Sequence, residues 1–248
     1  MNAVSYKDSN YDEALAAGCD VVQLKYDGWW SHIILNGPSI KYFSKTHREF
    51  RSDLTTNTRQ CEIIAETLTG TQWAQTASRK DTAIAFDLAS INSIALDSTT
   101  YRDRHALLRT LQPELPHNFS LVQNYPIAAF HELWETYVIN MDYEGVVFRS
   151  TKWDLNHKLY RQKLIVTEDL TLISIYEGEG KHSGRLGGIN GRTPEGIMVK
   201  VGGGFSDALR EDIWNEPGKY LGRTFEIEAR RKFASGSFRH PNFVKWKL

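Results

Sequence analysis

The sequence predicts an α+β protein of two domains, in which a larger domain of mixed strands and helices precedes a small β-barrel. The chain has 248 residues, of which 41% are hydrophobic, so it can fill real cores and does not belong to the disordered or low-complexity classes. From residue 158 onward the strands shorten and glycines cluster, and we expect domains at 1–167 and 168–248. The second domain has about five short strands and one helix near 206–215, which fits a small five-stranded barrel such as an OB-fold.

The larger domain shows clear start and stop signals for its elements. The segment Ser9–Glu13 can begin a short capped helix that Gly18 ends, Thr99-Thr100 can open a second helix, and Pro126 can open a third. Helices are therefore predicted at 9–17, at 99–108 and from 126 onward. Strands are predicted at 21–26, 31–36, 40–44, 61–68, 82–88 and 143–150.

Several classes of protein are excluded by composition and pattern. Mean hydropathy is −0.45, and no apolar run approaches the ~20 residues of a membrane span. The start of the chain lacks the basic-then-apolar order of a secretion signal. Cys19 and Cys61 show no metal-binding or disulfide spacing, so we expect a reducing, cytoplasmic location.

The charges cancel overall but are unevenly distributed. There are 30 basic and 30 acidic residues; residues 168–248 sum to +2, residues 1–167 to −2, and the last thirty residues, 219–248, to +6. A basic, aromatic-rich tail suits a phosphate-bearing partner. On charge alone, a solvated surface strand is the better interpretation.

The tetrapeptide Lys25-Tyr26-Asp27-Gly28 is the focal motif. In a strand, Lys25 and Asp27 would share a face, and Gly28 would let the chain turn away. A lysine attacks as a nucleophile only after losing its proton, so its ordinary pKa of about 10.4 must fall. Taken alone, the motif is more often a surface lysine before a turn.

Four further segments add possible chemistry in a fixed order along the chain. Glu66 and Glu144 are lone carboxylates of apolar strands, where a divalent cation is a suitable partner. Phe86, at a strand end, can stack on a base. Arg161 and Lys163 lie two residues apart on one strand face, where they can clamp a phosphate. Each alone is more often core or surface, but together they favour a nucleotide site.

In this order the residues resemble the covalent nucleotidyltransferases, specifically the ATP-dependent DNA ligases of the small bacterial or phage type. Lys25 stands where that family has its adenylylated lysine. The other similar segments of the first domain are Ser44-Lys45, Ala65-Glu66, Phe86-Asp87, Tyr101–Arg104, Glu144-Gly145 and Arg161–Lys163. In the tail they are Glu179–Lys181, Leu186–Gly188, Lys200–Asp207 and Gly236–Phe243, so the resemblance spans residues 20 to 248. It implies an ATP-grasp-like nucleotidyltransferase domain of antiparallel sheets and helices, followed by an OB-fold barrel.

The resemblance also implies roles for individual residues. The catalytic residues would be Lys25, Asp27, Arg161 and Lys163. The nucleotide would be bound by Gln23, Lys45, Glu66, Phe86 and Lys163, with Gln23 reading the adenine. Glu144 and Glu66 would hold Mg²⁺ or Mn²⁺. DNA would contact Arg48, Lys181, Arg230, Arg231, Lys232 and Arg239.

Lys45, Ala65 and Arg161 differ from the residues usual at their places in the family, and two further departures matter more. Trp30 stands where the family commonly has an arginine near the ribose or the nick 5′-phosphate, and Lys45 or Arg48 would then serve instead. The chain ends Lys245–Leu248, so Lys247 stands for the arginine of the usual final Arg-x-Asp-Lys motif and no Asp-Lys follows.

The implied function is the sealing of nicks in double-stranded DNA, through a lysyl-AMP intermediate and adenylylated DNA, in DNA repair or replication. We expect a monomer without an obligate protein partner or a membrane, in the cytoplasm of a bacterium or a phage-infected host. The alternatives are an RNA ligase, an mRNA guanylyltransferase that would select GTP, and a non-catalytic nucleic-acid-binding relative of the ligases.

Overall fold

The chain divides into two compact units, Met1–Lys163 and Leu164–Leu248. The computed structural model describes residues 5–54, 59–68, 82–233 and 235–247, so Leu248, the last residue of the predicted terminal segment Lys245–Leu248, lies outside the described residues. The boundary expected from the sequence, between residues 167 and 168, lies inside strand β13 (Val166–Glu177) of the second unit. Among the described residues no helix is long and apolar enough to cross a membrane.

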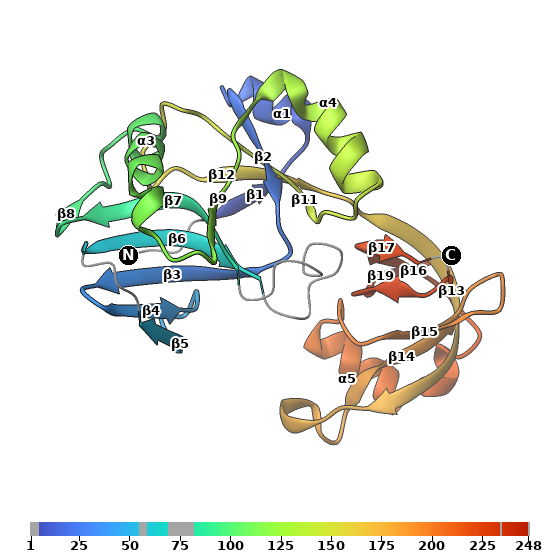
Figure 1. The fold of residues 1–248 in the computed structure, drawn as a ribbon. Helices are drawn as coiled ribbons and strands as arrows, with labels where there is room; N and C mark the ends of the chain where they lie inside the picture. The colour runs from blue at the N-terminus through green and yellow to red at the C-terminus, as the bar shows by residue number, and fades with distance from the viewer. Residues whose placement is uncertain (1–4, 55–58, 69–81, 234, 248) are drawn as a thin grey trace. The chain divides into compact units, whose positions relative to one another are not determined.

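The described strands of the first unit form two sheets (Figure 1). The first sheet has the order β1-β12-β11-β2-β10, with β1 parallel to β12 and the other pairs antiparallel. Its strands are β1 (Tyr6–Asp8), β2 (Val21–Lys25), β10 (Tyr125–Pro126), β11 (Gly145–Arg149) and β12 (Leu159–Lys163). The runs VVQLK and GVVFR are apolar along most of their length because β2 and β11 are buried on both faces.

The second sheet has the order β5-β4-β3-β6-β7-β8, and β9 also pairs with β7. Its strands are β3 (Trp29–Asn36), β4 (Ser39–Phe43), β5 (Glu49–Leu54), β6 (Cys61–Thr67), β7 (Ala83–Ile91), β8 (Ile94–Ala95) and β9 (Phe119–Leu121). The predicted strands at 31–36, 40–44, 61–68 and 82–88 are confirmed within a few residues. Strand β5 was not predicted, because its sequence EFRSDL is polar; it is an edge strand with no buried residue.

The helices of the first unit begin where the sequence predicts. Asn10 caps α1 (Tyr11–Ala16), and Thr100 caps α3 (Tyr101–Leu111), which a 3₁₀ turn (Gln112–Glu114) extends. The helix predicted from Pro126 is composite. It runs through a 3₁₀ turn (Ile127–Ala129), α4 (Phe130–Leu133) and a π-helical segment (Trp134–Ile139).

The two faces of the second sheet pack against different partners. On β7, Ala83 and Ala85 belong to a cluster with Leu108 of α3, whereas Ile84 and Phe86 belong to a cluster with residues of the first sheet. This alternation follows from the two-residue period of a strand. The second cluster fills the space between the two sheets of this unit, where the candidate site lies.

The second unit is an antiparallel sheet of order β15-β14-β13-β16-β19 with one packed helix. Its further elements are β14 (Leu186–Arg192), β15 (Met198–Val201), α5 (Asp207–Asn215), β16 (Thr224–Ala229), β17 (Arg231–Lys232), β18 (Phe238–Arg239), β19 (Asn242–Trp246) and the 3₁₀ turns Gly180–His182 and Pro217–Lys219. A bridge between Gly203 and Asn242 joins the two edges of the sheet and curls it toward a barrel. Arg210 of α5 donates to the carbonyl groups of Leu186, Gly187 and Gly202, which fastens the helix to the sheet.

Candidate active site

Lys25 is the last residue of β2, a strand flanked by β11 and β10, and only 7% of it is exposed. In the sheet, Lys25 pairs with Gly145 and Gln23 pairs with Val147. Because Gln23 and Lys25 are two residues apart on β2, their side chains share one face of the first sheet. Because β2 ends at Lys25, Asp27 lies beyond the strand. The expectation that Lys25 and Asp27 share a strand face is therefore wrong.

Two glycines let the backbone come close to the site. A Cβ on Gly28 would lie 3.0 Å from the Glu66 Cβ, so the chain after Lys25 can run tightly along β6. A Cβ on Gly145 would lie 2.1 Å from the carbonyl oxygen of Gln162, so any other residue would push β11 away from β12. Each glycine thus brings a carboxylate-bearing segment close to a lysine-bearing one.

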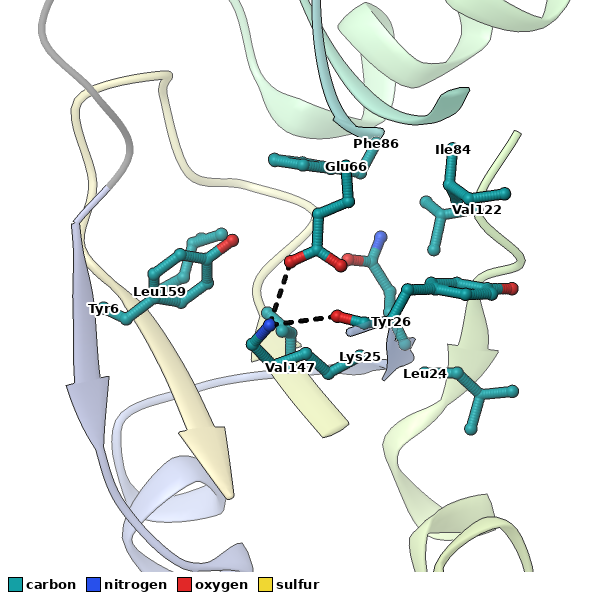
Figure 2. A pocket seen from close by; sticks show the side chains of 11 residues that line it. Tyr6, Leu24, Lys25, Tyr26, Glu66, Ile84, Phe86, Val122, Val147 and Leu159 are labelled. Carbon is teal, nitrogen blue, oxygen red and sulfur yellow. Dashed lines mark hydrogen bonds and ion pairs between the residues drawn. The ribbon is translucent and has the colours of Figure 1, made fainter. Parts of the chain in front are cut away.

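The amine of Lys25 lies between two buried carboxylates. Its Nζ donates to Glu66 Oε1 at 2.9 Å, to Glu144 Oε2 at 2.5 Å and to the carbonyl oxygen of Tyr26 at 3.2 Å. Figure 2 shows Glu66 reaching toward Lys25 from the opposite side of the pocket. Glu66 comes from β6, whereas Glu144 directly precedes β11.

The ion pairs set the protonation of the site. Burial alone would lower the pKa of Lys25, but the carboxylates of Glu66 and Glu144 outweigh it and hold that pKa above its ordinary value. Burial raises the pKa of Glu66 despite the ammonium group of Lys25. Burial would also raise the pKa of Glu144, but the ammonium groups of Lys25 and Lys163 lower it to about 2. At neutral pH Lys25 is therefore charged.

Lys163 and Arg161 extend from β12 on the same face of the sheet, as the sequence predicts. Lys163 Nζ lies 2.8 Å from Glu144 Oε1, and burial lowers the pKa of its amine. Arg161 instead donates to Asp8 of β1 at 2.6 and 3.2 Å. That ion pair was not expected from the sequence, because it depends on the pairing of β1 with a strand about 150 residues away in the chain.

The face that carries Lys25 borders a largely apolar cavity (Figure 2). The cavity encloses about 310 Å³, part of it open to solvent. Its lining comes from both sheets of the unit and consists of Tyr6, Gln23, Leu24, Lys25, Tyr26, Glu66, Ile84, Phe86, Val122, Val147 and Leu159. Gln23, Glu66 and Phe86, all predicted to bind the nucleotide, thus meet at one cavity.

A buried ionic network supports the wall that carries Phe86. Asp87 accepts from Arg104 Nε at 2.7 Å and from Arg149 Nη2 at 2.5 Å, and these guanidinium groups outweigh burial and lower the pKa of Asp87. Arg149 also donates to the carbonyl oxygen of Phe86 at 3.2 Å. Sequence reasoning missed Arg149. Its position two residues after Val147, on the same strand face, was the available signal.

Two predicted residues, Lys45 and Arg48, belong neither to the cavity lining nor to the ion pairs around Lys25, and Trp30 also lies outside the lining. Lys45 and Arg48 lie in the turn between β4 and β5, where the Ser44 N–H donates to the Arg48 carbonyl oxygen and the Arg48 N–H donates to the Ser44 hydroxyl. Trp30 pairs with Glu66 across β3 and β6 and packs against the cluster between the sheets. The structure therefore brings Lys25, Glu66, Glu144 and Lys163 together and leaves Lys45 and Arg48 in a hairpin.

The predicted DNA-binding residues of the second unit lie near its surface. Lys181 and Lys232 are exposed, whereas Arg230, Arg231 and Arg239 are partly exposed. Lys232 pairs with Glu168 at 2.6 Å, and Lys247 pairs with Glu226 at 2.5 Å and Asp169 at 3.1 Å. Acidic residues of the same unit therefore compensate part of the basic tail.

Comparison with known proteins supports the predicted fold. Residues 177–247 match the family model of the DNA ligase OB-like domain, whereas no curated protein matches the sequence. A solved structure of a Lig E DNA ligase is similar over all of both chains, at 17% identity and a TM-score of 0.69. A structure named Pmar-Lig_PreS3 is similar at 20% identity and a TM-score of 0.65, over 98% of this chain and 67% of its own. A mycobacterial DNA ligase D complexed with ATP and MES is similar at 14% identity and a TM-score of 0.53, over 99% of this chain and 95% of its own.

These similarities confirm the predicted α+β class. The chain has the fold of the minimal ATP-dependent DNA ligases, a nucleotidyltransferase domain followed by an OB-like domain. The roles of single residues rest on the geometry given above.

Proposed function

We propose that this protein is an ATP-dependent DNA ligase that seals nicks between a 5′-phosphate and a 3′-hydroxyl in duplex DNA. The observation that carries the proposal is Lys25, a buried amine at an apolar cavity, with two carboxylates and a second lysine beside it. Phe86, Ile84 and Val147 offer apolar surface to a base.

The reaction would proceed in three transfers. The Lys25 amine attacks the α-phosphorus of ATP, so a P–N bond forms and the P–O bond to pyrophosphate breaks. The DNA 5′-phosphate then takes the AMP, which breaks the P–N bond and joins the two phosphates. Finally the 3′-hydroxyl attacks the DNA phosphorus, a phosphodiester forms and AMP leaves.

The residues around Lys25 would serve the first transfer by controlling its charge. Glu66 and Glu144 hold the amine protonated in this structure, so the proton must leave before the attack. Lys163, and Arg161 once released from Asp8, would bind phosphate oxygens. Gathering positive charge around the phosphates would both favour the transition state and lower the pKa of Lys25.

The carboxylates of Glu66 and Glu144 suit Mg²⁺ or Mn²⁺, which prefer oxygen ligands. No group of three acidic, histidine or cysteine residues in the described chain could hold a metal alone, which suits a cation shared with substrate phosphates. Glu66 and Glu144 would hold the cation, which would supply positive charge to the phosphate oxygens.

The test is covalent labelling of the purified chain with α-labelled ATP, followed by ligation of a nicked duplex. We expect the wild type to be labelled and the Lys25→Ala variant not to be labelled. Lys41→Ala is the matched control, because Lys41 is an exposed lysine paired with Glu49. A labelled Lys25→Ala variant would exclude Lys25 as the nucleophile. Labelling with GTP instead, or sealing of RNA rather than nicked DNA, would favour the capping-enzyme or RNA-ligase alternative.

A further inference from the structure

The cavity carries an amide, Gln23, whose orientation is set by residues that do not themselves line the cavity. Gln23 lies two residues before Lys25 on β2 and is 2% exposed. Its Nε2 donates to the Tyr101 hydroxyl at 2.7 Å and to Asn124 Oδ1 at 2.6 Å. An amide nitrogen has two hydrogens, so both are used behind the cavity wall. The polar atom of Gln23 that remains for a ligand is the oxygen, an acceptor.

The three residues form a directional ring of hydrogen bonds. The Tyr101 hydroxyl accepts from Gln23 and donates to Asn124 Oδ1 at 2.9 Å, so Asn124 Oδ1 accepts twice. If the Asn124 amide were turned over, its NH₂ group would donate instead. Every hydrogen bond among the three residues would then run in the opposite direction, and Gln23 would present its NH₂ group to the cavity. The Asn124 oxygen therefore decides which end of Gln23 a ligand meets.

The ring of Tyr101 is itself held in place. The Arg149 guanidinium lies 3.3 Å from the Tyr101 ring centroid, and the same group donates to Asp87 and to the carbonyl oxygen of Phe86. The hydroxyl that orients Gln23 and the backbone of Phe86 are thus tied to one arginine.

Bases differ at the edge that a glutamine can read: adenine presents an amino group, whereas guanine presents a carbonyl oxygen.

We propose that Asn124 and Tyr101 are positioning residues that turn the oxygen of Gln23 toward the cavity, so that the site selects adenine over guanine nucleotides. The inference rests on the proposed nucleotidyl transfer to Lys25 and adds to it the origin of base selectivity. The buried Gln23 oxygen can accept a hydrogen bond from the amino group of adenine. It repels the carbonyl oxygen of guanine, and both oxygens would then lack a hydrogen-bond donor.

The experiment compares covalent labelling of the full chain by ATP and by GTP, measured as kcat/KM for each nucleotide. Asn124→Leu removes the acceptor at similar volume, and Tyr101→Phe removes the hydroxyl but keeps the ring on Arg149. We expect each change to lower the ATP-to-GTP ratio about tenfold, the worth of one hydrogen bond, mainly through KM for ATP. Gln123→Leu is the control, because it removes an exposed amide next in sequence and should keep the wild-type ratio.

Asn124→Asp separates orientation from general damage to the fold. A carboxylate can only accept, so it locks Gln23 in the proposed orientation and should keep or raise the ATP preference. The neighbouring network of Asp87, Arg104 and Arg149 has a formal charge of +1, which favours a carboxylate nearby. If Asn124→Leu and Tyr101→Phe still label with ATP but keep the wild-type ATP-to-GTP ratio, this inference is overturned and the proposed function stands. Loss of preference in Asn124→Asp would also overturn it. Absence of labelling in the wild type would overturn the proposed function, and this inference with it.

Discussion

Lys25 is held in the protonated form, which cannot act as a nucleophile. Its amine donates to two carboxylates and one carbonyl group. Because only about 8% of its side chain is exposed, the amine has little contact with water to which it could transfer a proton. A nucleotide with its cation would compete for Glu66 and Glu144. Under the proposed function, the ion pairs would keep the lysine ordered before substrate arrives and would make its activation depend on substrate.

Glu144 should contribute to stability in a pH-dependent way. Its folded-state pKa of about 2 lies below the ordinary 4.5, so its contribution is present above pH 4.5 and is lost as the pH falls toward 2. The shift corresponds to about 3 kcal/mol. We expect Glu144→Gln to reduce the free energy of unfolding at pH 7 and to flatten its fall with acid, measured by urea unfolding from pH 7 to pH 3. An acid profile parallel to that of the wild type would contradict this assignment.

Asp87 should matter more for stability than its single charge suggests. Asp87→Asn would leave Arg104 and Arg149 buried without their carboxylate, which typically costs about 3–5 kcal/mol. Asp53→Asn is the matched control, because Asp53 pairs with Arg51 near the surface and should cost less than about 1 kcal/mol. Chemical unfolding of both variants measures the difference. Equal losses would show that the network contributes no more than a surface ion pair.

At the scale of the elements, β11 lies between β2 and β12 and holds the two lysines of the site in register. Gly145 faces Lys25 on one side and Lys163 on the other. Gly145→Ala would drive a Cβ into the Gln162 carbonyl group, so the strands must separate. We expect a loss of roughly 1–3 kcal/mol in unfolding experiments, as for overpacked cores, and a matching loss of covalent labelling. Gly218→Ala, where a Cβ would meet nothing within 4 Å, should change neither. Wild-type stability in Gly145→Ala would refute the close approach.

Local signals predicted most elements of the fold, because caps and alternation act over a few residues. The helices that Asn10 and Thr100 cap begin close to their predicted starts, and the glycine clusters mark the second unit. The polar edge strand β5 gave no such signal. The motif order predicted that Lys25, Glu66, Glu144 and Lys163 would lie together. The pairing of Arg161 with Asp8 and of Arg149 with Asp87 depends on strand order in the sheets, which no local pattern encodes.

At the scale of the whole molecule, charge is divided between the two units. The last thirty residues carry a net charge of +6, which already includes Glu226, the partner of Lys247. Glu168 and Asp169, outside that segment but in the same unit, further compensate Lys232 and Lys247. A polyanion can exchange places with these carboxylates, since surface ion pairs contribute little. Binding of duplex DNA to this unit should therefore be insensitive to sequence and sensitive to salt.

A triple variant tests whether this unit binds DNA through its basic tail: alanine replaces Arg230, Arg231 and Lys232. We expect weaker binding of a nicked duplex and a salt slope smaller by up to about 0.9 for each phosphate that these side chains no longer neutralise, because fewer counterions are released. Covalent labelling with ATP should change much less, because its reacting lysine and carboxylates belong to the first unit. The charge-matched control replaces three exposed basic residues of the first unit, Arg102, Arg109 and Lys158, by alanine. If both triple variants bind the duplex equally weakly, net charge rather than this tail governs binding. If the tail variant keeps the wild-type salt slope, DNA is held elsewhere.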